Sequence, residues 1–258
     1  MALRILITGA TSGLGQELAR QLAAQGCRLA LTGRRAERLH EIAEEARRAG
    51  AQVLELAGDV TDRDCVERHY AEIKTHFGGL DWAVLNAGIS KSKSARIKFS
   101  SDDYRQVFET NIFGAVYWIE QVLPDMLLAG SGVIAGVSSI AGYRGLPNAG
   151  AYSASKAAFT SLLESVRVDV RGTGVDVVTI CPGFVRTELT DRWKPEDMPF
   201  LMEPRDAAKR MIAGIRARKR VVHFPWPLSS AMKYVVRNLP GWIYDRVVAR
   251  AAKRRPKY

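Results

Sequence analysis

The sequence predicts an α/β fold in which one doubly wound parallel sheet carries helices on both faces. Three observations predict it. Short runs of apolar and β-branched residues alternate with amphipathic stretches, glycine or proline follows several of these segments, and no Pro/Gly/Ser-rich linker interrupts the pattern. Such alternation is typical of parallel sheets, because a helix returns the chain to the edge where the next strand begins. The 258 residues are therefore interpreted as a single domain.

The elements follow one another in a regular order along the chain. Apolar, β-branched runs predict strands at 3–8, 28–32, 52–56, 80–86, 132–138 and 175–181. Amphipathic stretches predict helices at 14–25, 36–49, 62–77, 102–127 (one long helix or two abutting ones) and 151–171. Gly26, Gly50 and Gly172 follow three of these helices, a place where glycine commonly ends a helix, and Pro182-Gly183 ends the last strand.

The charge is distributed unevenly. Residues 1–204 contain 23 Lys/Arg and 25 Asp/Glu, a net of −2, and residues 205–258 contain 15 Lys/Arg and 2 Asp/Glu, a net of +13, which together give the +11 of the chain. The basic C-terminal fifth indicates a contact with an anionic surface. No nucleic-acid recognition motif accompanies this charge, so a nucleic-acid partner is not expected.

The cysteine count and the hydrophobic runs indicate where the protein works. Cys27, Cys65 and Cys181 are odd in number, widely spaced and match no metal pattern, so we expect them to be reduced and packed. The apolar run at 3–7 is too short for a signal peptide, and no 18-residue apolar stretch occurs. A cytoplasmic location is expected. No metal site is expected either, because the histidines form no ligand cluster and are interpreted as surface or packing residues: His40, His69, His76 and His223.

A glycine-rich turn lies between the first predicted strand and helix. Residues 8–15 have the spacing G-x3-G-x-G, which departs from the commoner G-x-G-x2-G of dinucleotide sites. A phosphate at this place would bind free backbone N–H groups and the positive end of the helix dipole, and glycine lets it approach closely. The turn predicts nucleotide binding, with a plain strand-to-helix turn as the alternative, by Gly9, Thr11, Ser12, Gly13, Leu14 and Gly15.

The end of the second strand indicates which dinucleotide would bind. Dinucleotide sites for NAD place an acid there, but this strand ends in Thr-Gly followed by Arg34 and Arg35. A guanidinium binds a 2′-phosphate through two charge-assisted hydrogen bonds, whereas a carboxylate repels it. The sequence therefore favours NADP, with Arg34 as the first choice of ligand and Arg35 or Ser12 assisting. The alternative is that both arginines open a solvated helix.

A Tyr-x3-Lys pattern at Tyr152 and Lys156 predicts acid–base chemistry. Residues four apart share one face of a helix, where an ammonium group lowers the pKa of a tyrosine hydroxyl. Such a tyrosine exchanges a proton with an alcohol or carbonyl oxygen near neutral pH. Tyr70 and Lys74 have the same spacing on a charged helix and are interpreted as surface structure. The first pair differs because Ser139 ends a strand thirteen residues upstream, at the edge of the sheet where ligands bind.

Taken together, these segments resemble the short-chain dehydrogenase/reductase family of the NADP-preferring, Tyr-x3-Lys type. The matching pieces occur in family order and cover roughly residues 1–190: 8–15, Asp59-Val60, Asn86-Ala87-Gly88, Asn111 within Thr-Asn-Ile, Ser138-Ser139, 152–156, and Pro182-Gly183 with Thr187. Leu85 stands where many members have a second Asn, a tolerated departure. The resemblance implies a Rossmann-like fold, an oxidoreductase acting on a CH–OH/C=O pair with NADP or NADPH, and a homodimer or homotetramer.

The resemblance also implies roles for particular residues. Tyr152 would be the general acid/base, Lys156 would lower its pKa and hold the nicotinamide ribose, and Ser139 would bind the substrate oxygen, with Ser138 out of register. Asn111 would bend its helix and hold a water in the proton relay. The remaining cofactor contacts would be Asp59 and Val60 at the adenine, Asn86, Ala87 and Gly88 along the cofactor, and Pro182, Gly183, Val185 and Thr187 at the carboxamide.

The segment at 188–203 and the C-terminus would determine the substrate. The segment combines Trp193, Met198 and Phe200 with other apolar residues and resembles an apolar lid, which predicts a lipophilic substrate. Tyr143, Leu146 and Pro147 are expected to add pocket wall. The alternative is that the apolar residues of 188–203 only pack that segment on the core.

Residues 221–258 form a basic amphipathic extension of the domain at 1–220. Aromatic and apolar residues recur at helical spacing in 226–248 and are followed by Lys253, Arg254 and Arg255. Trp with basic flanking residues suits a membrane interface, so one hypothesis is peripheral attachment to anionic lipid. A self-association surface or a clasp on the neighbouring face of the domain is the other. A non-catalytic NADP-binding regulatory or scaffold protein on the same fold is the competing function, although none of its expected losses of Tyr, Lys or Ser is present.

Overall fold

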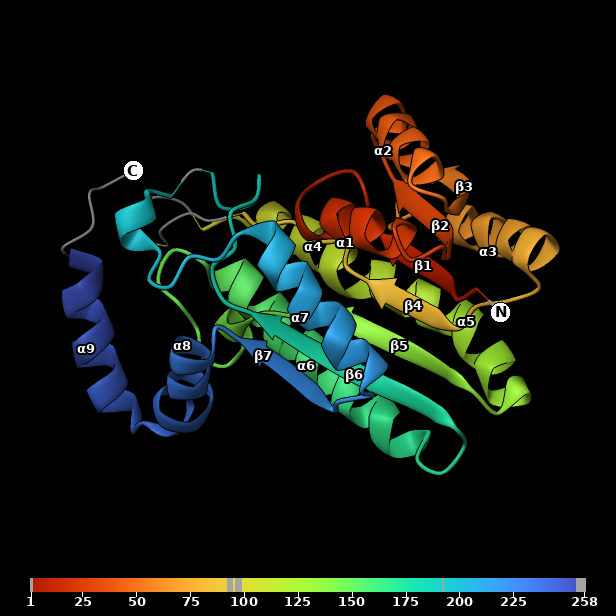
Figure 1. Cartoon of the computed structure of the whole chain (residues 1–258). Coiled ribbons are helices and arrows are strands. Elements are labelled where there is room, and N and C mark those ends of the chain that lie inside the picture. The colour runs from red at the N-terminus through yellow and green to blue at the C-terminus, as the bar shows by residue number, and fades with distance from the viewer. Residues whose placement is uncertain (1, 92–94, 96–98, 192, 254–258) are drawn as a thin grey trace.

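The computed structural model describes residues 2–91, 95, 99–191 and 193–253. Seven parallel strands form one sheet in the order β3-β2-β1-β4-β5-β6-β7 (Figure 1). The predicted doubly wound parallel fold is confirmed, because the strand order reverses between β1 and β4. The strands are β1 (Arg4–Thr8), β2 (Arg28–Gly33), β3 (Gln52–Ala57), β4 (Trp82–Leu85), β5 (Gly132–Val137), β6 (Val175–Pro182) and β7 (Val221–Phe224).

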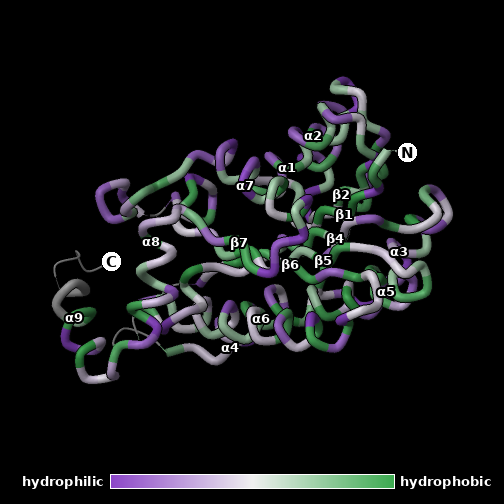
Figure 2. The backbone as a smooth tube through the Cα atoms, turned by 60° about the horizontal axis from the view of Figure 1, so that its bottom comes forward, coloured by the Kyte–Doolittle hydropathy of each residue, from purple (hydrophilic) through white to green (hydrophobic). Residues whose placement is uncertain are grey.

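The helices form two layers with the sheet between them. Figure 2 shows α1, α2 and α7 on one side of the strands and α3 to α6 on the other. Each layer has its own buried cluster, with Leu18 and Met211 in the first and Trp118 and Phe159 in the second. The helices are α1 (Gly13–Ala23), α2 (Ala36–Arg48), α3 (Arg63–Phe77), α4 (Ser101–Phe108), α5 (Gly114–Ala129), α6 (Gly150–Asp169), α7 (Pro204–Arg216), α8 (Trp226–Ser230) and α9 (Gly241–Lys253).

Local sequence explains where these elements begin and end. The central strands consist of continuous apolar runs because helices cover both of their faces, and all four residues of β4 are buried. The carboxylate of Asp62 accepts a hydrogen bond from the Cys65 N–H at 3.0 Å and so caps α3. Gly78 ends the same helix in the left-handed conformation, with φ 72°.

The expected long helix at 102–127 is a nearly continuous run with one irregular turn. A π-helical turn, Glu109–Phe113, separates α4 from α5. Asn111 lies inside this turn and is 1 % exposed. Extra residues of this kind widen a helix locally and often lie at functional sites, so the helix is irregular at the residue where a bend was expected.

Two elements were not expected, and both lie in the C-terminal quarter. Helix α7 packs beside α1, and β7 pairs with β6, so that Val222 lies opposite Ile180. Residues 221–224 therefore belong to the sheet, although the sequence analysis assigned them to the extension. The division at residue 220 otherwise stays a prediction. Beyond β7, two short non-α turns (Ala231–Val235 and Val236–Asn238) lie between α8 and α9.

Two interpretations of side chains need correction. Tyr70 is 3 % exposed and donates a hydrogen bond to Asp125 of α5, so it is a core residue and only Lys74 is at the surface. No ligand cluster was expected at the histidines, but His40, Glu44 and Glu55 place ligand atoms within 4.8 Å of one another. The Arg47 guanidinium bonds both carboxylates, at 2.7 and 2.5 Å, and so already supplies a cation. In the described part of the chain, no helix is long and apolar enough to cross a membrane.

Candidate active site

The glycine-rich turn joins β1 to α1 at the carboxyl edge of the sheet. Gly9 and Gly13 have φ values of 66° and 54°, which favour glycine. A side chain at Gly15 would clash with the Gly9 carbonyl oxygen, so the turn closes on itself only without one. Ser12 is the extended residue before α1, and no side chain caps the helix there. The result is a cradle of backbone N–H groups at a helix N-terminus, which suits the phosphates of a dinucleotide.

A second set of hydrogen bonds holds this turn against the end of β4. The Asn86 side-chain amide donates to the carbonyl oxygens of Thr8 and Gly9, at 3.0 and 3.2 Å. The Thr8 hydroxyl accepts from the backbone N–H groups of Asn86 and Ala87, at 2.9 and 3.0 Å. These bonds bridge the two strands at which the sheet order reverses. Thr8 is thus a site residue that sequence reasoning missed, although its place directly before Gly9 could have indicated it.

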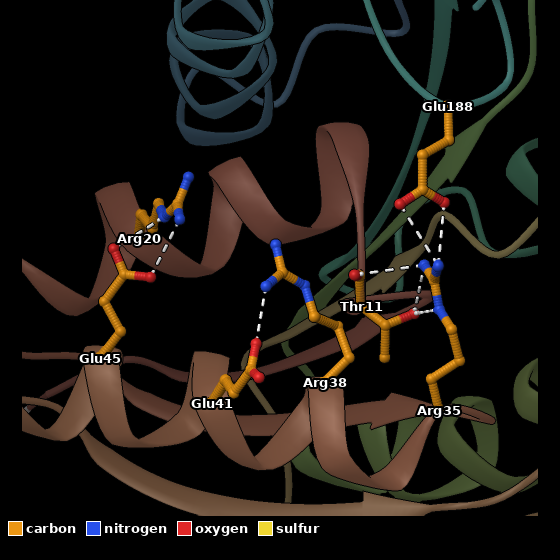
Figure 3. A network of polar contacts seen from close by, with 7 residues as sticks. All are labelled: Thr11, Arg20, Arg35, Arg38, Glu41, Glu45 and Glu188. Atoms are coloured by element: carbon orange, nitrogen blue, oxygen red, sulfur yellow. Dashed lines mark hydrogen bonds and ion pairs between the residues drawn. The ribbon is translucent and has the colours of Figure 1, made fainter.

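Two arginines follow β2 and have different surroundings. Arg34 is exposed, and its Nη1 lies 3.6 Å from a carboxylate oxygen of Asp59. Arg35 bonds Thr11 of the glycine-rich turn and Glu188 of the segment after β6 (Figure 3). The sequence placed both arginines at the 2′-phosphate, but only Arg34 has its donors available. Asp59 lies beside Arg34 at the end of β3, and Val60 is buried against Gly114.

Ser139 and Ser138 follow β5 and point in different directions. The Ser138 hydroxyl bonds the Lys156 carbonyl oxygen at 2.9 Å and the Thr160 hydroxyl at 2.7 Å, which is a structural role. Ser139 is 8 % exposed and caps the short turn Ile140–Gly142 by accepting from the Ala141 N–H at 3.1 Å. Ser139 therefore has a structural role as a cap at the end of β5. The Ser139 hydroxyl also lies beside Tyr152. Its hydrogen bond to Tyr152 lowers the pKa of the tyrosine.

Lys156, Asn111 and Gly88 converge beside Tyr152. The Lys156 ammonium is 5.7 Å from the centre of the Tyr152 ring and donates to the Val137 carbonyl oxygen at 2.8 Å. A Cβ atom at Gly88 would lie 3.2 Å from the Asn111 amide oxygen and 3.4 Å from the Lys156 nitrogen. The three elements that carry them, α6, the π-helical turn and the loop after β4, thus meet at one point.

The Asn111 side chain is fully engaged with the loop and with α6. Its oxygen accepts from the Ile89 N–H at 2.8 Å, and its nitrogen donates to the Ile89 carbonyl at 3.0 Å and to the Ser155 hydroxyl at 2.9 Å. Asn111 is therefore bonded to groups of the protein and not to solvent. Ser155 is a second site residue that sequence reasoning missed. Its contact with Asn111 joins residues 44 positions apart, which no local sequence pattern indicates.

The pKa values in this cluster are governed by burial. Burial raises the pKa of Tyr152, a hydrogen bond from Ser139 lowers it, and the nearby Cys181 raises it. Burial lowers the pKa of Lys156 to about 8. Lys156 is not among the causes of the Tyr152 shift, and the expectation that Lys156 lowers the pKa of Tyr152 stays a prediction. Tyr152 is consequently protonated at neutral pH and able to donate.

The segment after β6 closes the same edge of the sheet. Gly183 donates to the Phe224 carbonyl oxygen at 2.7 Å, and Val185 pairs with Met202. A Cβ atom at Gly13 would lie 3.0 Å from the Thr187 side chain, so Thr187 covers the glycine-rich turn. Of the predicted lid, Met198 is buried and Phe200 is exposed, so 188–203 is partly packed and partly open. Residue 192 lies outside the described residues.

The predicted site residues thus lie along one edge of the sheet. The cradle at Gly9–Gly15, the cation at Arg34 and the Ser139, Tyr152 and Lys156 cluster fit a nicotinamide dinucleotide that runs from β2 to β6. That order would place the phosphates over the uncapped helix and the reactive ring near Tyr152, at the switch point of the sheet where open α/β folds bind ligands. An acid–base tyrosine beside a hydroxyl group and an ammonium group can transfer a proton to or from a substrate oxygen.

Comparison with known proteins identifies the family of this chain. Residues 4–197 match the family model described as short chain dehydrogenase. An uncharacterized oxidoreductase of Myxococcus xanthus is 41% identical over 95% of this chain and 96% of its own length. The bovine dehydrogenase/reductase SDR family member 7B is 34% identical over 97% of this chain and 82% of its own length. A 3beta-hydroxysteroid dehydrogenase of Mediterraneibacter gnavus is 37% identical over 73% and 68%.

Solved structures share the fold over most of their length. A short chain dehydrogenase/reductase of Burkholderia phymatum in complex with NAD has a TM-score of 0.83 at 25% identity, covering 90% of this chain and 92% of that one. An alcohol dehydrogenase of the archaeon Thermococcus sibiricus complexed with 5-hydroxy-NADP has a TM-score of 0.78 at 26% identity, covering 87% and 95%. One of these neighbours holds NAD and the other an NADP derivative, so the fold alone does not select between the two cofactors.

Proposed function

Because this chain belongs to the short-chain dehydrogenase family of oxidoreductases, we propose that it uses NADP to move a hydride between the nicotinamide ring and an alcohol/carbonyl pair. The observation that carries the proposal is the convergence of Tyr152, Lys156 and Asn111 beside the glycine-rich turn. A non-catalytic scaffold would have no use for a buried lysine whose charge burial disfavours.

The residues of this chain supply the proton and orient the substrate. Bound NADPH would supply the hydride. Tyr152 donates its hydroxyl proton to the carbonyl oxygen, and Ser139 donates a hydrogen bond to the same oxygen as negative charge grows on it. Lys156 and Asn111 hold the neighbouring groups in place. Because burial raises the pKa of Tyr152, the proton-donating form predominates at neutral pH, which favours the reductive direction.

The preference for NADP is supported by Arg34. This residue follows β2, is 62% exposed in its side chain and has Asp59 as its ion-pair partner within the described residues, at 3.6 Å. A phosphate on the adenosine 2′-position would replace that long contact with charge-assisted hydrogen bonds. Arg34→Ala is therefore expected to weaken the binding of NADPH and to leave that of NADH unchanged.

A lipophilic ketone is the proposed substrate class. Exposed Leu189 and Phe200 lie in the segment that covers the cofactor edge, and this surface would be matched by an apolar substrate. One relative is named for a hydroxysteroid, which is a lipophilic alcohol. Small-molecule binding and self-association are usual in this family, and we propose a homodimer or homotetramer, which analytical ultracentrifugation would measure.

We further propose a cytoplasmic protein that touches anionic membranes through α8 and α9. Trp226, Tyr234, Val235, Trp242 and Val247 are between 55% and 70% exposed. Lys233 and Arg246 stack near Tyr234 and Trp242, at 5.1 and 6.0 Å. Aromatic rings with flanking cations suit the headgroup region of a bilayer. Arg254 and Arg255, which the hypothesis also uses, lie outside the described residues.

Three measurements test the enzyme. Cofactor fluorescence with NADPH and NADH measures binding, and a panel of ketones of graded chain length, followed by NADPH oxidation, identifies the substrate class. Tyr152→Phe is expected to keep cofactor affinity and to lower turnover by about 10²- to 10⁴-fold, the usual contribution of a general acid. Failure to bind either cofactor would refute the proposal, and full turnover by Tyr152→Phe would refute the role of the tyrosine.

A further inference from the structure

Every nitrogen of the Arg35 guanidinium makes a hydrogen bond within the protein. A guanidinium carries five N–H donors. The Nε atom donates to the Thr11 hydroxyl at 3.3 Å, and Nη2 donates to the same hydroxyl and to the Thr11 carbonyl oxygen, at 3.1 and 3.2 Å. The Nη1 atom donates to both carboxylate oxygens of Glu188, at 3.2 and 3.0 Å (Figure 3). Each of the three guanidinium nitrogens of Arg35 is therefore bonded within the protein.

Arg35 thus connects the glycine-rich turn, 24 residues before it in the sequence, to a segment 153 residues after it. Thr11 belongs to the glycine-rich turn and is 6% exposed, so it offers a rigid anchor. Glu188 belongs to the segment after β6, where the Thr190 hydroxyl accepts from the Thr187 N–H at 3.0 Å and donates to the Val185 carbonyl oxygen at 2.8 Å. Those bonds make 185–190 a compact turn, so a force on Glu188 is transmitted to Thr187.

Thr187 is the residue that this connection holds in place. Its side chain packs on Gly13, where an added Cβ would approach to 3.0 Å. The proposed nicotinamide half of the site lies on this side of the edge, next to the end of β6. A loosened turn at 185–190 would leave that half open, whichever nucleotide is bound.

We propose that Arg35 and Glu188 form a clasp that positions Thr187 over the cofactor edge, and that Arg35 does not bind the 2′-phosphate. Arg34 alone then determines the preference between NADP and NAD. This inference rests on the proposed function for the identity of the cofactor, but the clasp itself belongs to the protein without ligand.

The clasp predicts a pattern of cofactor affinities that a phosphate ligand would not give. Because both cofactors share the nicotinamide half, Arg35→Ala and Glu188→Gln each weaken NADPH and NADH by the same factor. That factor is about fivefold, the upper end for a partly exposed ion pair. The double variant is no weaker than either single one, since each change already breaks the same contact. Arg34→Ala, in contrast, weakens NADPH only.

A matched control lies on α2. Glu41 accepts from Arg38 at 2.6 Å and is exposed to a similar degree, 62% against 59% for Glu188, but its pair does not touch the glycine-rich turn. Glu41→Gln should leave both affinities unchanged. Figure 3 shows the two pairs side by side along α2.

A readout without cofactor separates this inference from the proposed function. Chymotrypsin can cleave after Leu189 and Phe200, and its initial rate follows the population of the open segment when reclosing is fast. Arg35→Ala and Glu188→Gln should each be cleaved about fivefold faster than wild type in 185–203, and Glu41→Gln at the wild-type rate.

The possible results distinguish the clasp from a phosphate ligand and from a failure of the proposed function. Loss of NADPH binding alone in Arg35→Ala, with NADH unchanged, would make Arg35 a phosphate ligand and overturn the clasp. Unchanged affinities and cleavage in Glu188→Gln would overturn it as well. Wild-type protein that binds neither nucleotide would refute the proposed function, whereas faster cleavage in the two clasp variants would still support the clasp.

Discussion

The carboxyl edge of the sheet and the C-terminal extension differ in how they are held. At the edge, buried polar side chains such as Thr8, Asn111 and Lys156 each bond more than one element or lie within a shared cluster. Helix α9 is attached by fewer contacts. The Tyr244 hydroxyl donates to the Gly145 carbonyl oxygen, and Arg144 stacks on the Tyr244 ring at 4.6 Å. Figure 1 shows α9 at the margin of the molecule, with α8 between it and the end of β7.

This difference indicates that the carboxyl edge and the C-terminal extension have separate roles. A buried network tolerates little change because every member has lost its water, so an unmade bond is costly. The extension instead presents large apolar side chains to solvent, which is unfavourable unless another surface covers them. The edge is therefore expected to govern turnover and stability, and the extension to govern where the enzyme meets its substrate.

The largest effect on turnover and stability is expected at Lys156, a buried charged residue that destabilises the fold but is needed for the proposed reaction. Burial lowers the pKa of Lys156 to about 8, against about 10.4 for a lysine in water. Each pKa unit corresponds to about 1.4 kcal/mol, so the protonated lysine costs the fold about 3 kcal/mol at neutral pH. Lys156→Met should remove turnover and raise the free energy of unfolding by about 2 kcal/mol at pH 7, the loss of the bond to Val137 offsetting the rest.

The pH dependence tests this explanation. With a folded pKa below the unfolded one, the full destabilisation by Lys156 is present below about pH 8, where it does not change with pH, and it is relieved as pH rises from about 8 to about 10.4. The advantage of Lys156→Met should therefore shrink between pH 7 and pH 9.5 in urea unfolding. Comparing the two proteins cancels Tyr152 and Tyr70, whose raised pKa values act in the opposite direction. A destabilised variant at pH 7 would contradict the prediction.

A second effect is expected where the glycine-rich turn is tied to β4. Thr8→Val keeps the shape of the side chain but removes the acceptor for the N–H groups of Asn86 and Ala87. Because Thr8 is 2% exposed, water cannot replace that acceptor, and we expect a loss of about 2 kcal/mol in urea unfolding. Thr75→Val, at an exposed position of α3, should change the free energy of unfolding by less than about 0.5 kcal/mol. Equal losses would mean that Thr8 is not a buried anchor.

The sequence predicted which residues lie at the carboxyl edge of the sheet better than it predicted the side-chain contacts between distant segments. The positions of Ser139, Tyr152 and Asn111 follow from where strands end and helices begin, which local pattern determines. Glu188 as the partner of Arg35, and Asp125 as the partner of Tyr70, depend on which helices the fold brings together, so no local pattern could indicate them. Strand β7 was missed because its four residues are followed directly by Pro225 and Trp226, which favour a turn.

A smaller effect is expected where the extension joins the domain. Tyr244→Phe removes the hydrogen bond to Gly145 and keeps the stacking with Arg144. A bond of this kind contributes about 1 kcal/mol, so amide hydrogen exchange in α9 should become about fivefold faster. Exchange in β5 should not change, since the edge is held by other contacts. Tyr234→Phe, an exposed position, is the control, and faster exchange throughout the sheet would show that the two regions are one cooperative unit.

The smallest effect on turnover, and the clearest separation of the regions, is expected from Trp226→Ala with Trp242→Ala. Both rings are largely exposed and neither touches the Tyr152 cluster, so reduction of a short, water-soluble ketone should proceed at the wild-type rate. Sedimentation with vesicles of phosphatidylcholine, with and without phosphatidylserine, should show wild type binding the anionic vesicles and the double variant binding at least about tenfold more weakly, since burying a large ring contributes roughly 2 kcal/mol. Leu128→Ala, an exposed apolar position on α5, should bind like wild type. Equal and negligible pelleting of every protein would exclude the membrane, and the exposed rings would then be assigned to contact between subunits, which a lower association state of the double variant in ultracentrifugation would reveal.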